Sequence, residues 1–164
     1  MRLRTVLPTS VGLATSVGLA AAALLAVPGA AAAGQVARPS VAHLRHAPKT
    51  PCGPAAHACV DLSAHRAWLT RGTRAIYGPV RIATGRPGYA TPPGTFHVTF
   101  KDIDHKSSVF DNAPMPYSVF FNGGIAFHEG SLSVLSHGCV HLSRNAAKTF
   151  YRHLSPGEVV QVVR

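Results

Sequence analysis

The chain has 164 residues, 46% of them apolar, which is enough for one packed domain and too little for two once an export leader is set aside. Its formal net charge of +10 suits an anionic partner. Nucleic acid is the usual partner of such a charge, but no basic run is interleaved with aromatic residues here, so we expect no nucleic-acid binding.

Residues 1–33 have the organisation of a cleaved export signal. Arg2 and Arg4 precede an apolar, alanine-rich stretch over residues 11–27, and three alanines before Gly34 offer a small-residue cleavage site. An uncleaved membrane anchor is the alternative, but the apolar stretch is at the short end for a span. We therefore expect an exported protein at the cell wall or at the extracellular face of the membrane.

A tether is expected between this signal peptide and the domain. Residues 34–50 contain Pro39, Pro48, basic residues and histidines without apolar periodicity, which predicts a disordered segment. The domain then occupies residues 51–164. Without the leader the chain keeps a formal charge of +8, which favours an anionic cell wall as partner; scattered arginines that only aid solvation are the alternative.

Three cysteines make an odd number in a chain that is expected to reach an oxidising compartment. Cys52 and Cys59 are close in sequence, with Gly53 and Pro54 between them, and predict a small disulfide loop at the entrance of the domain. Cys139 is then free. Such a thiol is an intermolecular partner, an inert buried group or a reactive nucleophile, and its histidine neighbours favour the last.

The first half of the domain predicts short strands and loops. Apolar or alternating runs bounded by glycine-containing turns predict four strands, over residues 60–62, 67–69, 74–76 and 79–83. Glycine and proline then predict a loop over 84–94, followed by a half-buried strand over 95–100 and a polar connection over 101–116.

The second half predicts a hairpin, a helix and a last strand. Residues 117–122 and 125–128 flank Gly123-Gly124, a hairpin pattern that brings His128 to a strand end. Ser143 is expected to cap a helix whose apolar face is Ala146, Ala147, Phe150, Tyr151 and Leu154. A strand over 158–163 completes a mostly β, mostly antiparallel domain with one clear helix, hence a sandwich or partly open barrel.

Residues 136–141 read Ser-His-Gly-Cys-Val-His and place the Cys139 thiol between two imidazoles. A thiol attacks carbonyls as thiolate, and with an unperturbed pKa of about 8.5 it needs a base at neutral pH. Gly138 would let nearby amides point at a developing oxyanion. In an extended segment His137, Cys139 and His141 would share one face.

Two chemistries fit this cluster of side chains. One is nucleophilic catalysis, with His128 favoured as the base because it approaches Cys139 from another element. The other is a zinc site of one cysteine and two or three histidines, which lacks the ligand spacing of common zinc sites. We therefore expect no metal and no cofactor.

The motif resembles the signature of the L,D-transpeptidase (YkuD-like) catalytic domain. The resemblance includes Phe127-His128 on a Gly-Gly hairpin, Met115-Pro116-Tyr117, and Thr91-Pro92-Pro93-Gly94-Thr95-Phe96, which is similar to the family's Thr-Pro-x-Gly-x-Phe segment. Its motifs occur in the family's order over residues 60–163.

This resemblance implies a β-sandwich-like catalytic domain with Cys139 as nucleophile and His128 as general base. It further implies an acyl and oxyanion pocket formed by Ser136, His137, Gly138 and Tyr117. The implied reaction is acyl transfer on peptidoglycan stem peptides: the thiolate attacks the third residue, releases D-alanine, and an amine of a second stem takes the acyl group from the thioester. We separately expect a monomer.

Two departures from the family pattern leave alternatives open. His141 stands where the family usually has Arg or Asn, and its role is uncertain; the loop over 129–136 is also short. Resolution of the thioester by water would make the chain an L,D-carboxypeptidase. Loss of turnover would make it a non-catalytic, wall-associated binding module of the same fold.

Overall fold

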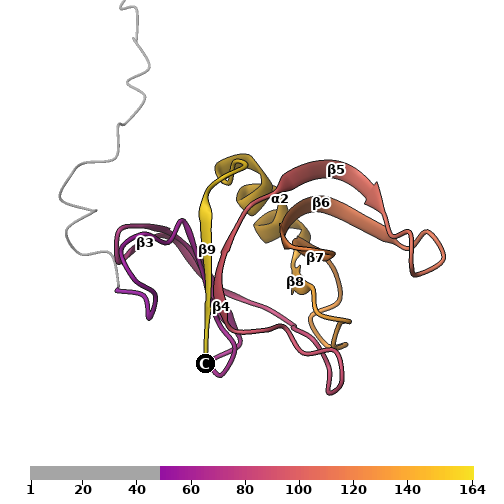
Figure 1. Cartoon of the computed structure of the whole chain (residues 1–164), viewed down its shortest axis with the longest axis horizontal. Helices are drawn as coiled ribbons and strands as arrows, with labels where there is room; N and C mark the ends of the chain where they lie inside the picture. The colour runs from indigo at the N-terminus through magenta and orange to yellow at the C-terminus, as the bar shows by residue number, and fades with distance from the viewer. Residues whose placement is uncertain (1–48) are drawn as a thin grey trace, which may run out of the picture. The chain divides into compact units, whose positions relative to one another are not determined.

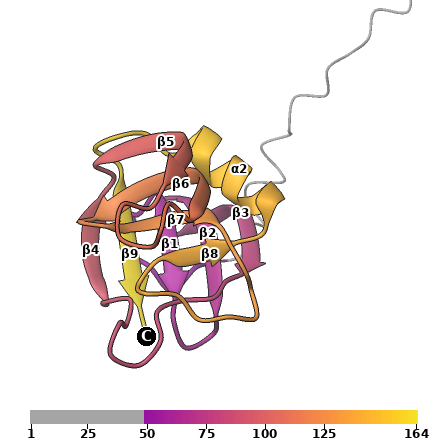
Figure 2. The same cartoon turned by 90° about the vertical axis from the view of Figure 1, so that its right-hand side faces the viewer.

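The structure is a computed structural model and describes residues 49–164. In these residues nine strands form two sheets, and one helix, α2, packs against them (Figures 1 and 2). The predicted signal peptide, residues 1–33, and all but the last two residues of the predicted tether lie outside the described residues. The predicted β-sandwich-like architecture with one clear helix after Cys139 is confirmed.

The larger sheet has the strand order β3-β2-β1-β9-β4. Its strands are β1 (Ala58–Asp61), β2 (Arg66–Arg71), β3 (Arg74–Arg81), β4 (Gly94–His97) and β9 (Val159–Val163). Neighbours are antiparallel except β1 and β9, which are parallel. The strands predicted over 74–76 and 79–83 form one strand, β3, whose register against β2 is irregular.

The smaller sheet has the order β5-β6-β7-β8 and carries the hairpin that leads to His128. Its strands are β5 (Phe100–Lys106), β6 (Pro114–Asn122), β7 (Ile125–Glu129) and β8 (Val140–Leu142). The β6–β7 hairpin is antiparallel as predicted, whereas β8 runs parallel to β7. Figure 1 shows β5 and β6 ending in a loop that projects away from the larger sheet.

The prediction for residues 95–116 was wrong in two respects. The expected strand over 95–100 ends at His97, and the expected connection over 101–116 contains β5. Two residues make the change of sheet: the amide of Val98 donates to Glu158 O at 2.8 Å, and that of Thr99 donates to Phe120 O at 2.8 Å. β5 is an edge strand, and edge strands tolerate charged side chains. The charged residues of β5 therefore give no strand pattern in the sequence.

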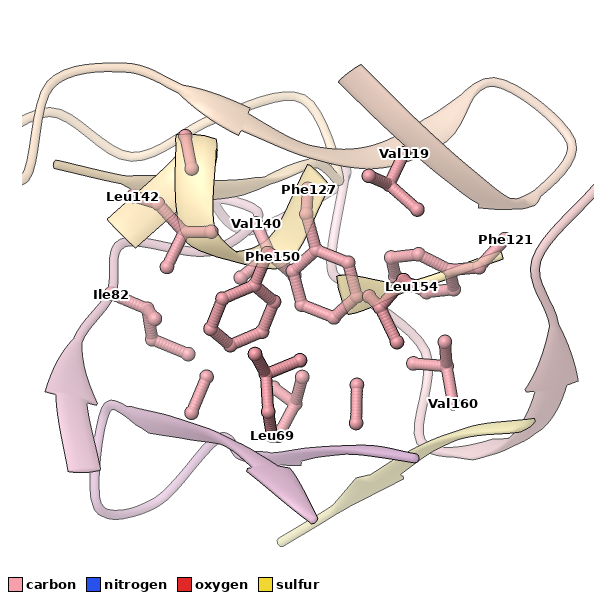
Figure 3. Close-up of a cluster of buried hydrophobic side chains, with 14 of the residues drawn as sticks. Leu69, Ile82, Val119, Phe121, Phe127, Val140, Leu142, Phe150, Leu154 and Val160 are labelled. Carbon is pink, nitrogen blue, oxygen red and sulfur yellow. The ribbon is translucent and has the colours of Figure 1, made fainter. Parts of the chain in front are cut away.

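The apolar core lies between the two sheets and includes one face of α2 (Arg144–His153) (Figure 3). Phe127 and Phe150 are fully buried at its centre, with ring centroids 5.0 Å apart. Ser143 caps the helix as predicted, its Oγ accepting from the Ala146 amide at 3.4 Å. Among residues 49–164, no helix is long and apolar enough to cross a membrane.

The entrance of the domain contains the predicted disulfide between Cys52 and Cys59. Two described residues, Lys49 and Thr50, precede the predicted domain boundary at residue 51. Lys49 pairs with Arg74, and the amide of Thr50 donates to Thr73 O at 2.9 Å. Both residues, which were assigned to the tether, therefore contact the β2–β3 hairpin.

Candidate active site

A cavity of about 570 Å³ lies where β7, β8 and the connections around them meet. Cys139, His128, His137, His141 and Ser136 all line it, so the structure brings together five of the predicted site residues. Most of its other lining side chains are apolar: Val109, Phe110, Ala113, Pro114, Met115, Ile125, Val134 and Leu135. A mainly apolar wall strengthens electrostatic effects on the few polar groups that it contains.

The backbone of the motif turns before Cys139. β8 begins at Val140, and Gly138 has a φ of 114°, in the region that favours glycine. Residues 137–141 are therefore not one extended segment, the condition under which His137, Cys139 and His141 would share a face. The turn directs His137 toward neighbouring loops and leaves Cys139 at the start of β8.

Ser136 holds this turn closed rather than facing a substrate. Its side chain is 4% exposed; the hydroxyl donates to Cys139 O at 2.6 Å and accepts from the Gly138 amide at 3.0 Å. The Gly138 amide is thus already occupied and does not point at an oxyanion in this conformation. The amides of Ser136 and His141 donate to Thr84 O at 3.0 Å and to Ala83 O at 2.8 Å, and Val140 lies in the β7–β8 ladder. The amides of His137 and Cys139 are therefore the candidate oxyanion donors.

Thr91 fixes the motif from the glycine-rich loop over 84–94. Its hydroxyl donates to Gly138 O at 2.8 Å and accepts from the Gly85 amide at 3.0 Å, and its side chain is 3% exposed. The sequence placed Thr91 in a family-like segment without a role. The only sign of this role in the sequence is the position of Thr91 directly before Pro92 and Pro93.

Cys139 is the free cysteine among the described residues and is partly exposed. Its thiol donates to the Gly124 carbonyl oxygen at 3.6 Å, within range for sulfur. Burial raises the pKa of the Cys139 thiol, and a hydrogen bond with the backbone of Ala126 opposes that rise. At neutral pH the resting group is therefore a thiol, which requires a base before it can attack.

His128, one residue before the end of β7, is in a form suited to accept a proton. The side chain is 6% exposed, and Nδ1 lies 2.7 Å from Glu129 O. Because a carbonyl oxygen only accepts, Nδ1 carries the proton and Nε2 keeps its lone pair. Burial lowers the pKa of His128 from 6.5 to about 4; the Glu129 hydrogen bond opposes this, and His141 adds to it. The imidazole is neutral at physiological pH.

This buried imidazole predicts a pH dependence of stability. Between the ordinary pKa of 6.5 and the folded value of about 4, the unfolded chain binds a proton at His128 and the folded chain does not. The contribution of His128 to the free energy of unfolding is therefore highest above pH 6.5. It falls by about 3 kcal/mol as the pH is lowered from 6.5 to about 4. Urea unfolding of the wild type and His128→Gln from pH 7 to pH 4 measures it. Equal losses in both proteins would contradict the burial of a neutral imidazole.

His141 packs directly on the candidate base. It pairs with His128 across the β7–β8 ladder, and the two ring centroids are 4.9 Å apart at 74°. Its Nδ1 donates to Ser131 O at 2.9 Å, while Gly130 lies so close that a Cβ there would be 2.6 Å from the ring. His141 therefore fastens the loop after β7 and limits the positions open to the His128 ring.

His137 belongs to a cluster that the sequence did not predict. Arg86 Nη2 lies 2.6 Å from His137 Nε2, and because a guanidinium only donates, this nitrogen is the acceptor. The His137 ring also contacts Tyr89 and Phe110, at centroid distances of 4.7 and 4.4 Å. Its Nε2 lone pair is engaged by Arg86, so His137 is poorly placed to act as the base. The sequence predicted loops around Arg86, Tyr89 and Phe110, but it did not predict that these loops contact His137.

Tyr117 does not line the cavity, contrary to its predicted place in the pocket. Its ring packs against Tyr151, with centroids 6.1 Å apart, and beneath the Arg144 guanidinium at 5.5 Å. These contacts direct it toward α2 and the core. The zinc alternative also lacks a ligand set, because no three His, Cys, Asp or Glu residues among residues 49–164 are grouped to hold a metal ion.

Comparison with known proteins bears on this arrangement. Residues 55–162 match the sequence profile of the L,D-transpeptidase catalytic domain (YkuD). The chain belongs to this family. A search of curated protein sequences found no match.

Solved L,D-transpeptidases share the fold. The enzyme from Stackebrandtia nassauensis is 30% identical, with a TM-score of 0.63, over 73% of this chain and 60% of that chain. One from Mycobacterium tuberculosis H37Rv is 25% identical, with a TM-score of 0.61, over 68% and 59%. L,D-transpeptidase 3 from Mycobacterium tuberculosis, in complex with a faropenem-derived adduct, is 23% identical, with a TM-score of 0.59, over 68% and 61%. The chain thus spans about 60% of the length of these proteins.

Proposed function

We propose that the chain is an exported peptidoglycan L,D-transpeptidase in which Cys139 is the nucleophile and His128 the general base. The observation that carries the proposal is one free thiol and one buried, neutral imidazole lining the same cavity in a chain of this family. The basic surface and the signal-like residues 1–33 support a location at an anionic cell wall.

In the first half-reaction a tetrapeptide stem acylates the enzyme. His128 Nε2 takes the Cys139 proton, and the sulfur attacks the carbonyl carbon of the third stem residue. The amides of His137 and Cys139 stabilise the oxyanion of the tetrahedral intermediate. The intermediate collapses with cleavage of the peptide bond to the terminal D-alanine, whose amine leaves with the proton that His128 holds. A thioester on Cys139 remains.

In the second half-reaction an amine of another stem takes the acyl group. The amine attacks the thioester carbon, and neutral His128 accepts the proton that the amine loses. Collapse of the second tetrahedral intermediate expels sulfur, which regains its proton from His128. One peptide bond is broken and one is formed, and the enzyme returns to its starting state without a cofactor.

The electrostatics of the site favour a neutral resting pair. Burial raises the pKa of Cys139 and lowers that of His128, so a thiolate–imidazolium pair is disfavoured before substrate arrives. The charge is then formed during attack, when oxyanion donors can stabilise it. This arrangement protects an exported thiol from oxidation, because thiolates oxidise faster than thiols.

Incubation of the protein with disaccharide tetrapeptides, followed by mass spectrometry, tests the proposal. Cross-linked dimers with loss of D-alanine are the expected products. Release of D-alanine without dimers would assign an L,D-carboxypeptidase instead. Absence of both products, together with an unmodified intact mass after incubation with faropenem or a carbapenem, would contradict catalysis and favour the binding module.

A further inference from the structure

A second cavity, of about 450 Å³, adjoins the catalytic one. Its walls come from the β1–β2 turn, the facing ends of β2 and β3, and the loop between β7 and β8, and they include Arg66, Arg81, Leu132, Ser133 and Leu135. Leu135 lines both cavities. One loop therefore separates the catalytic cavity from this second cavity, which we call the arginine cavity.

Two like charges face each other in the wall of the arginine cavity. Arg66 and Arg81 are direct partners in the β2–β3 ladder, an arrangement that destabilises a sheet unless something offsets the repulsion. Neither forms an ion pair with a carboxylate within residues 49–164. Asp61, the partner of Arg66 in β1, instead accepts from Ser63 Oγ at 2.7 Å and the Ala64 amide at 2.8 Å.

Both guanidiniums keep donors for a ligand. Arg66 Nη1 donates to His65 O at 3.1 Å, and Arg81 Nη2 donates to Leu132 O at 3.4 Å. Each guanidinium has five donors, and paired arginines suit the oxygens of carboxylates and phosphates. The Ser133 hydroxyl lies in the same wall.

We propose that the arginine cavity binds an anionic oxygen group, a carboxylate or a phosphate, on the cell-wall material that the enzyme engages. That the anion belongs to the wall rests on the proposed function; the anion site itself does not. The ligand offsets the repulsion between Arg66 and Arg81 by lying between their guanidiniums.

The arginine cavity is also positioned to affect catalysis. The intervening loop is held at two successive carbonyls: His141 holds Ser131 O from the catalytic side, and Arg81 holds Leu132 O from the other side. An anion that binds Arg81 competes with Leu132 O for its donors. An anion in the arginine cavity therefore weakens the bond between Arg81 and Leu132 O, and with it one of the two contacts that fix the loop in the wall of the catalytic cavity.

Titration of the isotopically labelled Cys139→Ala protein tests this site by nuclear magnetic resonance without turnover. The probes are a disaccharide tetrapeptide and glycerol phosphate. We expect shifts at the amides of residues 65–66 and 81–83, and about tenfold weaker binding in Arg66→Gln/Arg81→Gln. The control is Lys148→Gln/Arg152→Gln, which removes the same charge from two exposed positions on α2.

Each outcome decides one question. Shifts with the tetrapeptide alone assign a peptide carboxylate, and shifts with glycerol phosphate alone assign a phosphate. No shifts at these amides, or equal weakening by both double variants, would overturn the proposal. Faropenem labelling of the control protein Lys148→Gln/Arg152→Gln, with Cys139 intact, is expected to continue, because neither residue lines the catalytic cavity or the arginine cavity. If faropenem does not label the wild type, the proposed function is overturned, while the proposal of an anion site still stands.

Discussion

Replacement of Cys139 by alanine is expected to abolish both dimer formation and release of D-alanine. The proposed route passes through a thioester, and alanine offers no atom on which an acyl group can be carried. Among residues 49–164 the other two cysteines are joined in a disulfide, so no second thiol can substitute. Mass spectrometry of the muropeptide products measures the loss.

The matched control is Cys139→Ser, which keeps a weak nucleophile of similar size. Its residual acylation by faropenem is expected to fall by several orders of magnitude, because a hydroxyl beside His128 is far less nucleophilic than a thiol. Thermal unfolding of both variants is expected to show that the fold persists, since the Cys139 side chain is partly exposed. Dimers formed by Cys139→Ala at the wild-type rate would exclude the mechanism.

Most of the fold could be predicted because local signals and the final packing agree. The β6–β7 hairpin follows from Gly123-Gly124 between two apolar runs, and α2 follows from Ser143 and its apolar spacing. The switch of sheets at Val98 and Thr99 could not be predicted, because it depends on carbonyls of Glu158 and Phe120, which are distant in sequence. Strand direction in β8 likewise depends on long-range pairing.

The site could be predicted only in part. Cys139 and His128 line one cavity, as the hairpin and the motif indicated. The alternation of side chains along a strand does not apply to His137, because a positive φ at Gly138 turns the chain before Cys139. The contacts of Arg86 and Phe110 with His137 come from loops whose composition carries no information on where they dock.

Replacement of His128 by glutamine is expected to lower kcat/KM by about 10²–10⁴-fold and to change its pH dependence. In the wild type the base must be neutral, so kcat/KM should rise as the pH passes through the His128 pKa of about 4. In His128→Gln this rise is expected to disappear. Activity then follows solvent ionisation of Cys139, whose pKa is raised by burial, and increases only at alkaline pH.

Variants of the two other motif histidines separate the base from its neighbours. His137→Gln should keep the acid rise, because its Nε2 already accepts from Arg86. His141→Gln should move the midpoint of the rise to higher pH, since the electrostatic effect of His141 lowers the pKa of His128. Steady-state kinetics from pH 3.5 to 9 measures all three profiles. If His128→Gln kept the wild-type rate while His141→Gln lost the acid rise, the base would be His141, whose ring lies 4.9 Å from that of His128.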